Sequence, residues 1–218
     1  MVYFEKTQSA PASLAVEKAK TNGDYRQPDV LALLQSDFKN KCYLCEEKEP
    51  TSINIEHFVP HKGKNKDLEF DWNNLFFACY HCNNTKLQRI DLLNCTVSSD
   101  KVDSKICYRM ETFPKEVALI TATEPNPTEK VINTVLLLRD IYYGTTEEKK
   151  IESNNLRTKI LREINGFKKL LLDYFTEGSD KITLKAQIEE HLSSASAFTA
   201  FKRWIIWDNK RFSNEFPV

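Results

Sequence analysis

Two Cys-x2-Cys pairs constrain the fold of this chain more than any other feature of its sequence. They read C-Y-L-C and C-Y-H-C and contribute Cys42, Cys45, Cys79 and Cys82. Each pair can present two thiolates to one tetrahedral zinc ion, and four thiolates fill the coordination sphere of that ion. A filled sphere leaves no open position, so we predict a structural zinc that clamps the segment between the pairs. Four unrelated cysteines are the less favoured alternative.

The remaining cysteines and the histidine of the second pair do not change this prediction. His81 lies within C-Y-H-C and could replace a thiolate, but the four cysteines already suffice. Cys95 and Cys107 stand alone in the sequence, and we expect them to pack in the interior. In a cytoplasmic protein, cysteines are more often reduced, buried or metal-bound than paired in disulfides.

Composition and charge narrow the class of protein. Hydrophobic residues make up 41% of the 218 residues, which is typical of a soluble protein, and no stretch approaches the roughly 18 apolar residues of a membrane helix. The N-terminus lacks the basic and apolar regions of a secretory signal, so we expect a cytoplasmic protein with no membrane partner. The net charge is zero. A nucleic-acid partner would therefore need local contacts or positive charge from another subunit.

The sequence divides into three regions, and we predict a mostly α fold with a small α+β insert. We expect an N-terminal helical extension over residues 1–40, a zinc module over 41–95 and a helical region over 96–218. Apolar spacing, with Pro28 in a first turn and Gly144 after a last one, supports the helices. The predicted helices cover residues 28–40, 129–143, 146–178 and 183–208, the last interrupted near 193–196. A short strand is expected over 116–123.

Three details of the C-terminal region are also predicted. Thr128 is a plausible N-cap. The long helix is expected to end at Gly178 and to bury one apolar face. This face consists of Ile151, Leu156, Ile160, Ile164, Phe167, Leu171 and Tyr174. The aromatic tail over 197–216 is expected to complete the helical core through Phe201, Trp204 and Ile205, with a partner-docking surface as the alternative.

The segment between the cysteine pairs carries a second, independent signal. Glu56 and His57 are followed by Pro60 and then by D-W-N-N-L-F-F-A-C-Y-H-C-N-N-T-K. This order resembles the HNH endonuclease family, which has an acidic-His pair, an Asn-Leu step and a late Asn or His before a Lys. The resemblance covers residues 42–86. It implies a ββα-metal fold and a nuclease.

The resemblance implies a role for four residues. His57 corresponds to the general base, and Glu56 to the acidic metal ligand, which is usually Asp in the family. Asn83 corresponds to the second metal-binding residue, and Asn74 to the asparagine that braces the catalytic loop. Phosphodiester hydrolysis needs a base that titrates near neutral pH and a cation that offsets charge on the phosphate. Oxygen ligands favour Mg²⁺ or Mn²⁺, and the ligands on offer suit a single ion.

The roles of His61 and of the neighbouring lysines are open. His61 could join the catalytic metal, contact phosphate or be a polar residue of the loop. Four lysines crowd the same loop and the helix after the second cysteine pair, namely Lys62, Lys64, Lys66 and Lys86. They could contact the nucleic-acid backbone, although lysines in a loop are more often simply solvated.

The flanking sequence resembles a narrower group. The opening M-V-Y-F-E-K-T-Q-S-A-P, the wording I-E-H-F-V-P-H and L-E-F-D-W-N-N-L-F-F-A-C are similar to small bacterial HNH proteins that accompany a large ATPase in antiphage defence, in Septu-type pairs and some retron systems. This resemblance implies an ATPase partner, and the chain itself has no G-x-x-x-x-G-K-S/T loop. DNA is the family's usual substrate, and an RNA such as tRNA stays open. A non-catalytic zinc adaptor that binds nucleic acid or the ATPase is the alternative.

Overall fold

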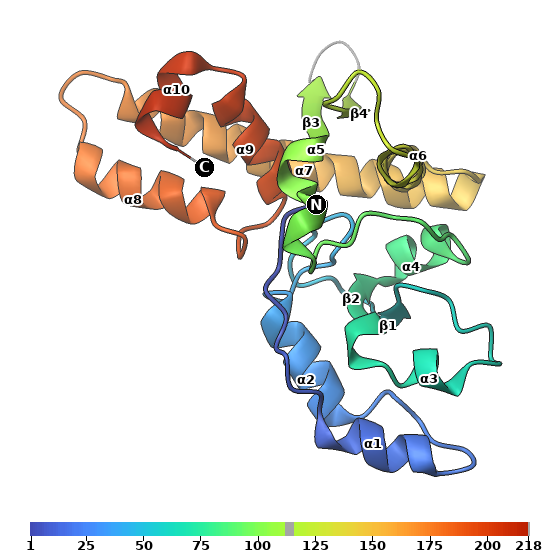
Figure 1. The fold of residues 1–218 in the computed structure, drawn as a ribbon. Helices are drawn as coiled ribbons and strands as arrows, with labels where there is room; N and C mark the ends of the chain where they lie inside the picture. Colours follow the sequence, from blue (N-terminus) through green and yellow to red (C-terminus); the bar gives the residue numbers. More distant parts are fainter. Residues whose placement is uncertain (112–115, 218) are drawn as a thin grey trace.

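The computed structural model describes residues 1–111 and 116–217, and about half of the chain is helical. Figure 1 places α1 and α2 at one end of the molecule and α8, α9 and α10 at the other, with a small ββα unit and α7 between them. The helices are α1 Ala12–Ala19, α2 Pro28–Asp37, α3 Lys66–Glu69, α4 Tyr80–Lys86, α5 Val102–Lys105, α6 Glu129–Tyr143, α7 Glu147–Tyr174, α8 Lys181–Leu192, α9 Thr199–Trp207 and α10 Lys210–Glu215. The strands are β1 Ile53–His57, β2 Leu75–Cys79, β3 Ile106–Glu111 and β4 Val117–Ala122, and two short 3₁₀ helices cover Trp72–Asn74 and Ser98–Asp100.

The ββα unit lies between the two cysteine pairs. β1 and β2 are antiparallel, with Glu56 opposite Phe76 and His57 opposite Leu75. β2 is buried along its whole length, and it runs directly into α4 because Cys79 is both its last residue and the N-cap of the helix. α4 packs against both strands. The predicted small α+β insert is therefore confirmed.

The N-terminal extension contains two helices. α2 begins with Pro28 in its first turn, as predicted, but it ends at Asp37. Lys39 and Asn40 adopt positive φ values of 56° and 55°, and a left-handed backbone cannot continue a right-handed helix. The predicted end at residue 40 is therefore three residues too late.

A second two-stranded sheet follows the ββα unit. β4 confirms the predicted strand, and it pairs with β3 in antiparallel register from Ile106 opposite Ala122 to Glu111 opposite Val117. The sequence analysis missed β3. Three consecutive buried residues begin this strand, so it lacks the alternation of apolar and polar residues that identifies a half-buried strand.

The C-terminal helices agree with the predicted order. α6 has the predicted bounds and stops before Gly144, whose φ is 75°. Thr128 occupies the N-cap position, but its side chain makes no capping hydrogen bond. α7 ends at Tyr174 rather than at Gly178, and Ile151 is 66% exposed, unlike the other six residues of the predicted face. The break between α8 and α9 is confirmed.

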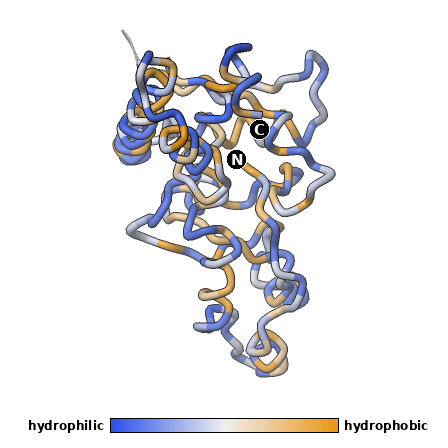
Figure 2. The backbone as a smooth tube through the Cα atoms, turned by 90° about the vertical axis from the view of Figure 1, so that its left-hand side faces the viewer, coloured by the Kyte–Doolittle hydropathy of each residue, from blue (hydrophilic) through white to orange (hydrophobic). Residues whose placement is uncertain are grey.

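Two clusters of apolar residues form the interior. The larger joins the N-terminal segment, the ββα unit, β3, β4, α6 and the first half of α7. The smaller joins the second half of α7 to α8, α9 and α10. In Figure 2 the backbone beside the N-terminus has the colour of hydrophobic residues and lies near the centre of the molecule. Phe201 is buried, and Trp204 and Ile205 pack against the larger cluster, as predicted for the aromatic tail.

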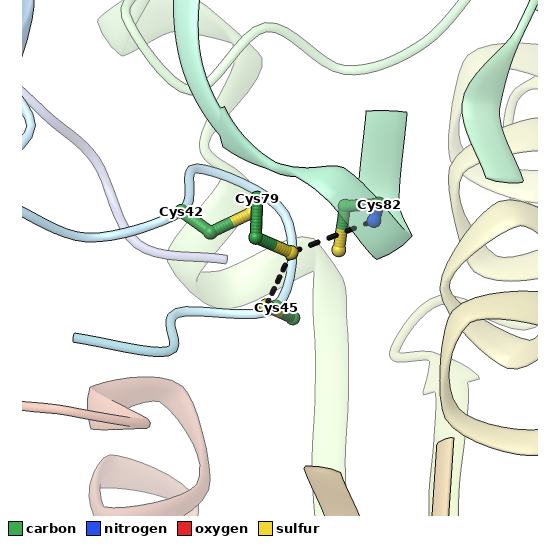
Figure 3. Close-up of side chains that lie close together, drawn as sticks. All are labelled: Cys42, Cys45, Cys79 and Cys82. Carbon is green, nitrogen blue, oxygen red and sulfur yellow. Dashed lines mark hydrogen bonds between the residues drawn. The ribbon is translucent and has the colours of Figure 1, made fainter. Parts of the chain in front are cut away.

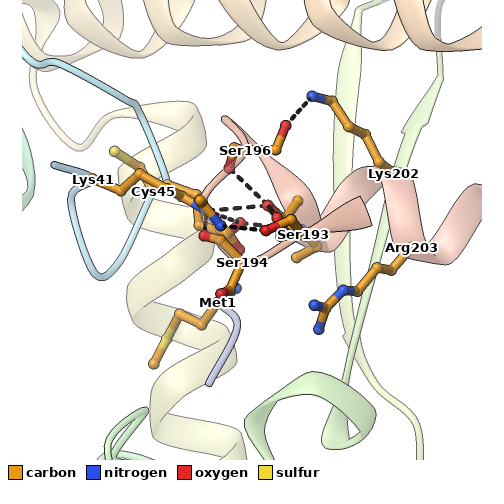
Figure 4. A network of polar contacts seen from close by, with 12 residues as sticks. Met1, Lys41, Cys45, Ser193, Ser194, Ser196, Lys202 and Arg203 are labelled. Carbon is orange, nitrogen blue, oxygen red and sulfur yellow. Dashed lines mark hydrogen bonds and ion pairs between the residues drawn. The ribbon is translucent and has the colours of Figure 1, made fainter. Parts of the chain in front are cut away.

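A buried ionic network ties the first cysteine pair to the C-terminal helices. The Lys41 ammonium donates to the Ser194 carbonyl at 2.8 Å and to Glu46 Oε2 at 3.3 Å. The same carboxylate oxygen accepts the backbone N–H of Ala200 at 3.1 Å. Figure 4 shows this network, in which the Lys202 ammonium also donates to the Ser196 hydroxyl at 2.8 Å. None of the described helices is long and apolar enough to cross a membrane.

Candidate active site

The four cysteines of the two pairs form one cluster, which we call the cysteine cluster. All four are buried, and their sulfur atoms lie within 4.8 Å of one another. Figure 3 shows them converging between the loop of the first pair and the junction of β2 with α4. The Sγ atoms of Cys45 and Cys79 are 3.8 Å apart. A zinc tetrahedron with Zn–S bonds of about 2.3 Å needs a sulfur separation of roughly 3.8 Å, so the cluster fits a zinc ion.

The electrostatics of the cluster also suit a cation. Burial raises the pKa of Cys42, but hydrogen bonds from the other three thiols outweigh this and leave that pKa well below its ordinary value. Burial raises the pKa of the Cys45 and Cys82 thiols. The thiols therefore share hydrogen bonds that favour thiolate charge within the cluster, and zinc binding would require all four to be deprotonated.

The other cysteines and His81 lie outside this cluster. Both ring nitrogens of His81 are engaged, Nδ1 with Glu152 Oε2 at 2.8 Å and Nε2 with the Ile141 carbonyl at 2.7 Å. His81 therefore fastens α4 to α6 and α7 and does not replace a thiolate. Cys95 and Cys107 are buried free thiols, as expected for packing residues.

A cleft of about 370 Å³ opens at the opposite end of the ββα unit. Its walls come from the end of β1, the following loop and α4. The lining residues are Glu56, His57, Pro60, His61, Lys62, Gly63, Asn83, Asn84, Leu87 and Gln88. The fold thus brings together Glu56, His57 and Asn83, which the sequence analysis singled out, and it adds His61 to the same wall.

His57 is held in one tautomer. Its Nε2 lies 2.9 Å from the Glu69 carbonyl oxygen. A carbonyl only accepts, so Nε2 carries the hydrogen and Nδ1 is the unprotonated nitrogen of the neutral ring. Burial lowers the pKa of His57 to about 4, and the hydrogen bond to Glu69 opposes this only in part. At neutral pH the imidazole is therefore uncharged and can accept a proton, but its pKa lies below the near-neutral value expected from the sequence, because the ring is buried.

Glu56 is paired with a buried lysine. Lys86 is fully buried, and its ammonium donates to Glu56 Oε1 at 2.7 Å and to the His57 carbonyl at 2.9 Å. Burial raises the pKa of Glu56, whereas the charge and the hydrogen bond of Lys86 lower it. The prediction that Lys86 contacts nucleic acid is wrong, because the ammonium lies inside the protein. It holds the Glu56 carboxylate and the backbone of the proposed base instead.

Asn74 fixes the loop between β1 and α3. Its Oδ1 accepts the backbone N–H of Val59 at 2.6 Å. Its Nδ2 donates to the carbonyls of Val59 and Leu68, both at 2.9 Å. Asn74 is 3% exposed, so these bonds form away from water. The side chain closes the loop that leads from His57 to His61 and α3.

Three cleft residues offer ligands to a hard cation. Glu56 and Asn83 provide carboxylate and amide oxygens, the donors that Mg²⁺ and Mn²⁺ prefer. His61 Nδ1 is buried, and among the described residues it has no hydrogen-bond partner. Glu69 Oε2 lies 3.9 Å away, within ion-pair range but too far for a hydrogen bond. The unpaired nitrogen of His61 is consistent with a ligand role, and the chemistry of these three donors suits a divalent ion.

The loop lysines lie on the surface beside the cleft. Lys62 lines the cleft, and both Lys62 and Lys64 are exposed. Lys66 is also exposed, but its ammonium donates to the Lys20 carbonyl. Lys62 and Lys64 therefore remain the two lysines of this loop with an available charge near the cleft, and their contact with nucleic acid stays a prediction.

The comparison with protein families agrees with this geometry. Residues 42–89 match the family model of the HNH endonucleases. The matched segment contains the cysteine cluster, both strands of the ββα unit, α4 and every residue that lines the cleft. The chain therefore carries an HNH endonuclease domain. A search of curated proteins found no match to the chain.

Proposed function

We propose that this protein is a metal-dependent HNH endonuclease that hydrolyses phosphodiester bonds, with DNA as its first expected substrate class. The observation that carries this proposal is the state of His57. Its Nε2 hydrogen is committed to the Glu69 carbonyl, and the uncharged ring lines a cleft that it shares with Glu56 and Asn83. A base, a carboxylate and an amide in one cleft are the groups that phosphodiester hydrolysis requires.

The residues of the cleft have separable tasks. His57 Nδ1 accepts a proton from the attacking water, whose oxygen forms a bond to phosphorus while the bond to the leaving oxygen breaks. Glu56, Asn83 and His61 would hold the divalent cation. When bound, Mg²⁺ or Mn²⁺ offsets negative charge on the phosphate and on the leaving oxygen. Lys86 keeps the Glu56 carboxylate in place, and Asn74 fixes the loop that carries His61.

We further propose that this nuclease is the effector of a bacterial antiphage complex with a large ATPase. The support is the resemblance of the N-terminal opening, residues 1–11, and of the wording of residues 55–61 and 68–79 to small HNH proteins of Septu-type and retron systems. The zero net charge fits such a complex, because a partner could supply the positive surface that nucleic-acid binding requires. Purification of a tagged chain from its native host, followed by identification of the bound proteins, tests the complex; a chain that elutes without a large ATPase contradicts it.

A non-catalytic zinc adaptor is the second candidate, and one observation favours it. Glu56 Oε1 is already occupied by the Lys86 ammonium, which competes with a cation for the carboxylate. A module that had lost its catalytic metal would need such a partner for a buried carboxylate. The Lys86 pair leaves Glu56 Oε2 for the cation, so the two candidates differ in whether that oxygen binds metal.

A cleavage assay separates the two candidates. Purified protein is incubated with supercoiled plasmid or total tRNA in Mn²⁺, Mg²⁺ or EDTA, and wild type is compared with His57→Ala. We expect metal-dependent cleavage that falls by about 100-fold or more in His57→Ala, with zinc content unchanged. His191→Ala is the matched control, since that histidine lies on α8 and outside the cleft. Equal activity in wild type and His57→Ala, or no cleavage even with the ATPase present, would favour the adaptor.

A further inference from the structure

We propose that Tyr25, in the N-terminal extension, is a positioning residue that holds the His57 imidazole in its working orientation. The inference rests on the proposed nuclease function. Tyr25 lies outside residues 42–89, so the domain match assigns it no role. Its ring centroid is 4.6 Å from that of His57, with an interplanar angle of 78°. Perpendicular aromatic pairs at this separation are favourable and directional.

The imidazole of His57 is restrained by three contacts of different kinds. Tyr25 packs against it edge to face, and His61 lies at a centroid distance of 4.3 Å with an angle of 49°. The third contact is the hydrogen bond from Nε2 to the Glu69 carbonyl. The hydrogen bond fixes which nitrogen is protonated but allows the ring to tilt about it. The two ring contacts limit that tilt, and Tyr25 is the one supplied from outside the domain.

The loop that carries Tyr25 is rigidly built. A side chain at Gly23 would place its Cβ 1.9 Å from the Glu17 carbonyl oxygen, so the backbone passes too close to α1 for any other residue. Glu17 Oε2 accepts the backbone N–H of Asp24 at 3.1 Å. Gln27 Nε2 donates to the Asp24 carbonyl at 2.9 Å. These contacts tie the loop to α1 on one side and to α2 on the other.

The end of α1 and the start of the same loop are fastened to the segment that holds His57. The Lys66 ammonium donates to the Lys20 carbonyl, and Lys18 forms an ion pair with Asp67 at 2.6 Å. The Tyr25 ring also contacts Phe70 at a centroid distance of 6.4 Å. Residues 66–70 include Glu69, whose carbonyl binds His57. The N-terminal extension thus supports the base twice, directly through Tyr25 and indirectly through this segment.

The test compares Tyr25→Ala with Tyr25→Phe in the full chain, using plasmid cleavage in Mn²⁺. We expect Tyr25→Ala to lower kcat by about 100-fold, because a small displacement of a reacting group costs this much, while KM stays within about twofold. Tyr25→Phe keeps the ring, so its kcat should stay within about twofold of wild type. Tyr143→Ala is the matched control, because it removes a surface tyrosine that bonds the Ala118 carbonyl and does not line the cleft.

A second readout does not depend on activity. NMR relaxation of the His57 ring C–H groups reports how freely the ring moves, so Tyr25→Ala should increase that mobility and Tyr25→Phe should leave it nearly unchanged. Tyr25→Leu replaces Tyr25→Ala if the latter loses zinc or melts at a lower temperature. Wild-type kcat and unchanged ring mobility in Tyr25→Ala overturn the inference. If wild type cuts nothing even with the ATPase present, the proposed function fails, and the ring mobility alone decides whether Tyr25 holds the ring.

Discussion

Two buried lysine–glutamate pairs lie at opposite ends of the module that contains the cysteine cluster, and they have different roles. Lys41 and Glu46 flank the first cysteine pair, whereas Lys86 and Glu56 lie at the cleft. Both ammonium groups are fully buried. Each pair removes the cost of a lone buried charge, because an ion in the interior is tolerated only with a partner.

The pairs differ in what else binds the carboxylate. Glu46 also accepts the Ala200 N–H and lies 2.9 Å from the α-amino group of Met1. Burial raises the pKa of Glu46, but the positive charges of the Met1 α-amino group and Lys41 outweigh burial and bring that pKa to about 2. Glu56 has only Lys86 as an ionic partner among the described residues, and its carboxylate lines the cleft. The Glu46 carboxylate has several partners and only stabilises the fold. The Glu56 carboxylate has one ionic partner among the described residues and can still bind a ligand.

The largest expected effect comes from removing one cysteine of the cysteine cluster. Cys42→Ser removes one thiolate from the cysteine cluster, so zinc binding and the folding free energy linked to it are lost. We expect no bound zinc by elemental analysis and the loss of cooperative thermal unfolding for this module. Cys95→Ser is the control, since it changes a buried thiol outside the cluster and should retain one zinc per chain. Zinc retention in both variants would mean that the cluster is not the metal site.

The next prediction compares the two carboxylates directly. Glu46→Gln leaves Lys41 with an uncompensated buried charge, so the free energy of unfolding should fall by about 3–5 kcal/mol in chemical denaturation. Glu56→Gln should cost less stability, because Glu56 compensates one cation, Lys86, whereas Glu46 compensates both Lys41 and the Met1 α-amino group. It should lower kcat by about 100-fold or more, whereas folded Glu46→Gln keeps wild-type kcat. A larger loss of stability in Glu56→Gln together with a larger loss of kcat in Glu46→Gln would contradict this comparison.

A third buried lysine sharpens the comparison because it has no carboxylate partner among the described residues. The Lys6 ammonium donates to the carbonyls of Trp72 and Leu75 and lies 4.1 Å from the Trp72 ring centroid. Burial lowers the pKa of Lys6 to about 7.

This low value makes a pH-dependent prediction. Between about pH 7 and the pKa of an unfolded lysine near 10.4, the unfolded chain holds a proton that the folded protein has lost. Folding stability from this group therefore rises with pH, by at most about 1.4 kcal/mol per pH unit. Wild type should gain stability relative to Lys6→Met between pH 7 and 9 in denaturant titrations. A constant difference across this range would show that Lys6 stays protonated.

The smallest expected effect concerns an exposed lysine. Lys62→Ala removes one surface charge at the cleft, so nucleic-acid binding should weaken and its logarithmic salt dependence should fall by about one unit. Fluorescence anisotropy with a labelled oligonucleotide at several salt concentrations measures both. Lys48→Ala, which changes a lysine that lines a different cavity, is the control. An unchanged salt dependence would remove Lys62 from the binding surface.

Local sequence patterns predicted the module well because its chemistry is local. The spacing of the cysteine pairs indicated one four-thiol cluster, and the resemblance of the order of Glu56, His57 and Asn83 to the HNH family implied that they serve one active site. Helix α6 was predicted to the residue since its apolar spacing ends at a glycine. β3 was missed because its first three residues are all buried and show no alternation.

The contacts between distant segments could not be predicted. Lys86 lies on α4 and looks like a surface lysine in the sequence, yet the packing of α4 on β1 brings it to Glu56. Nothing near Tyr25 in the sequence indicates that its ring reaches His57. Both contacts depend on how separate elements pack, and propensity and spacing carry no information about that.

The most direct test of the account is the number and kind of metals that one chain binds. Zinc-loaded protein is titrated with Mn²⁺, and bound manganese is measured by electron paramagnetic resonance. We expect one saturable Mn²⁺ site in addition to one zinc, and its loss in Glu56→Ala with zinc retained. Absence of saturable Mn²⁺ binding, or equal binding in Glu56→Ala, would contradict the claim that the module is closed by zinc at one end and binds a catalytic cation at the other.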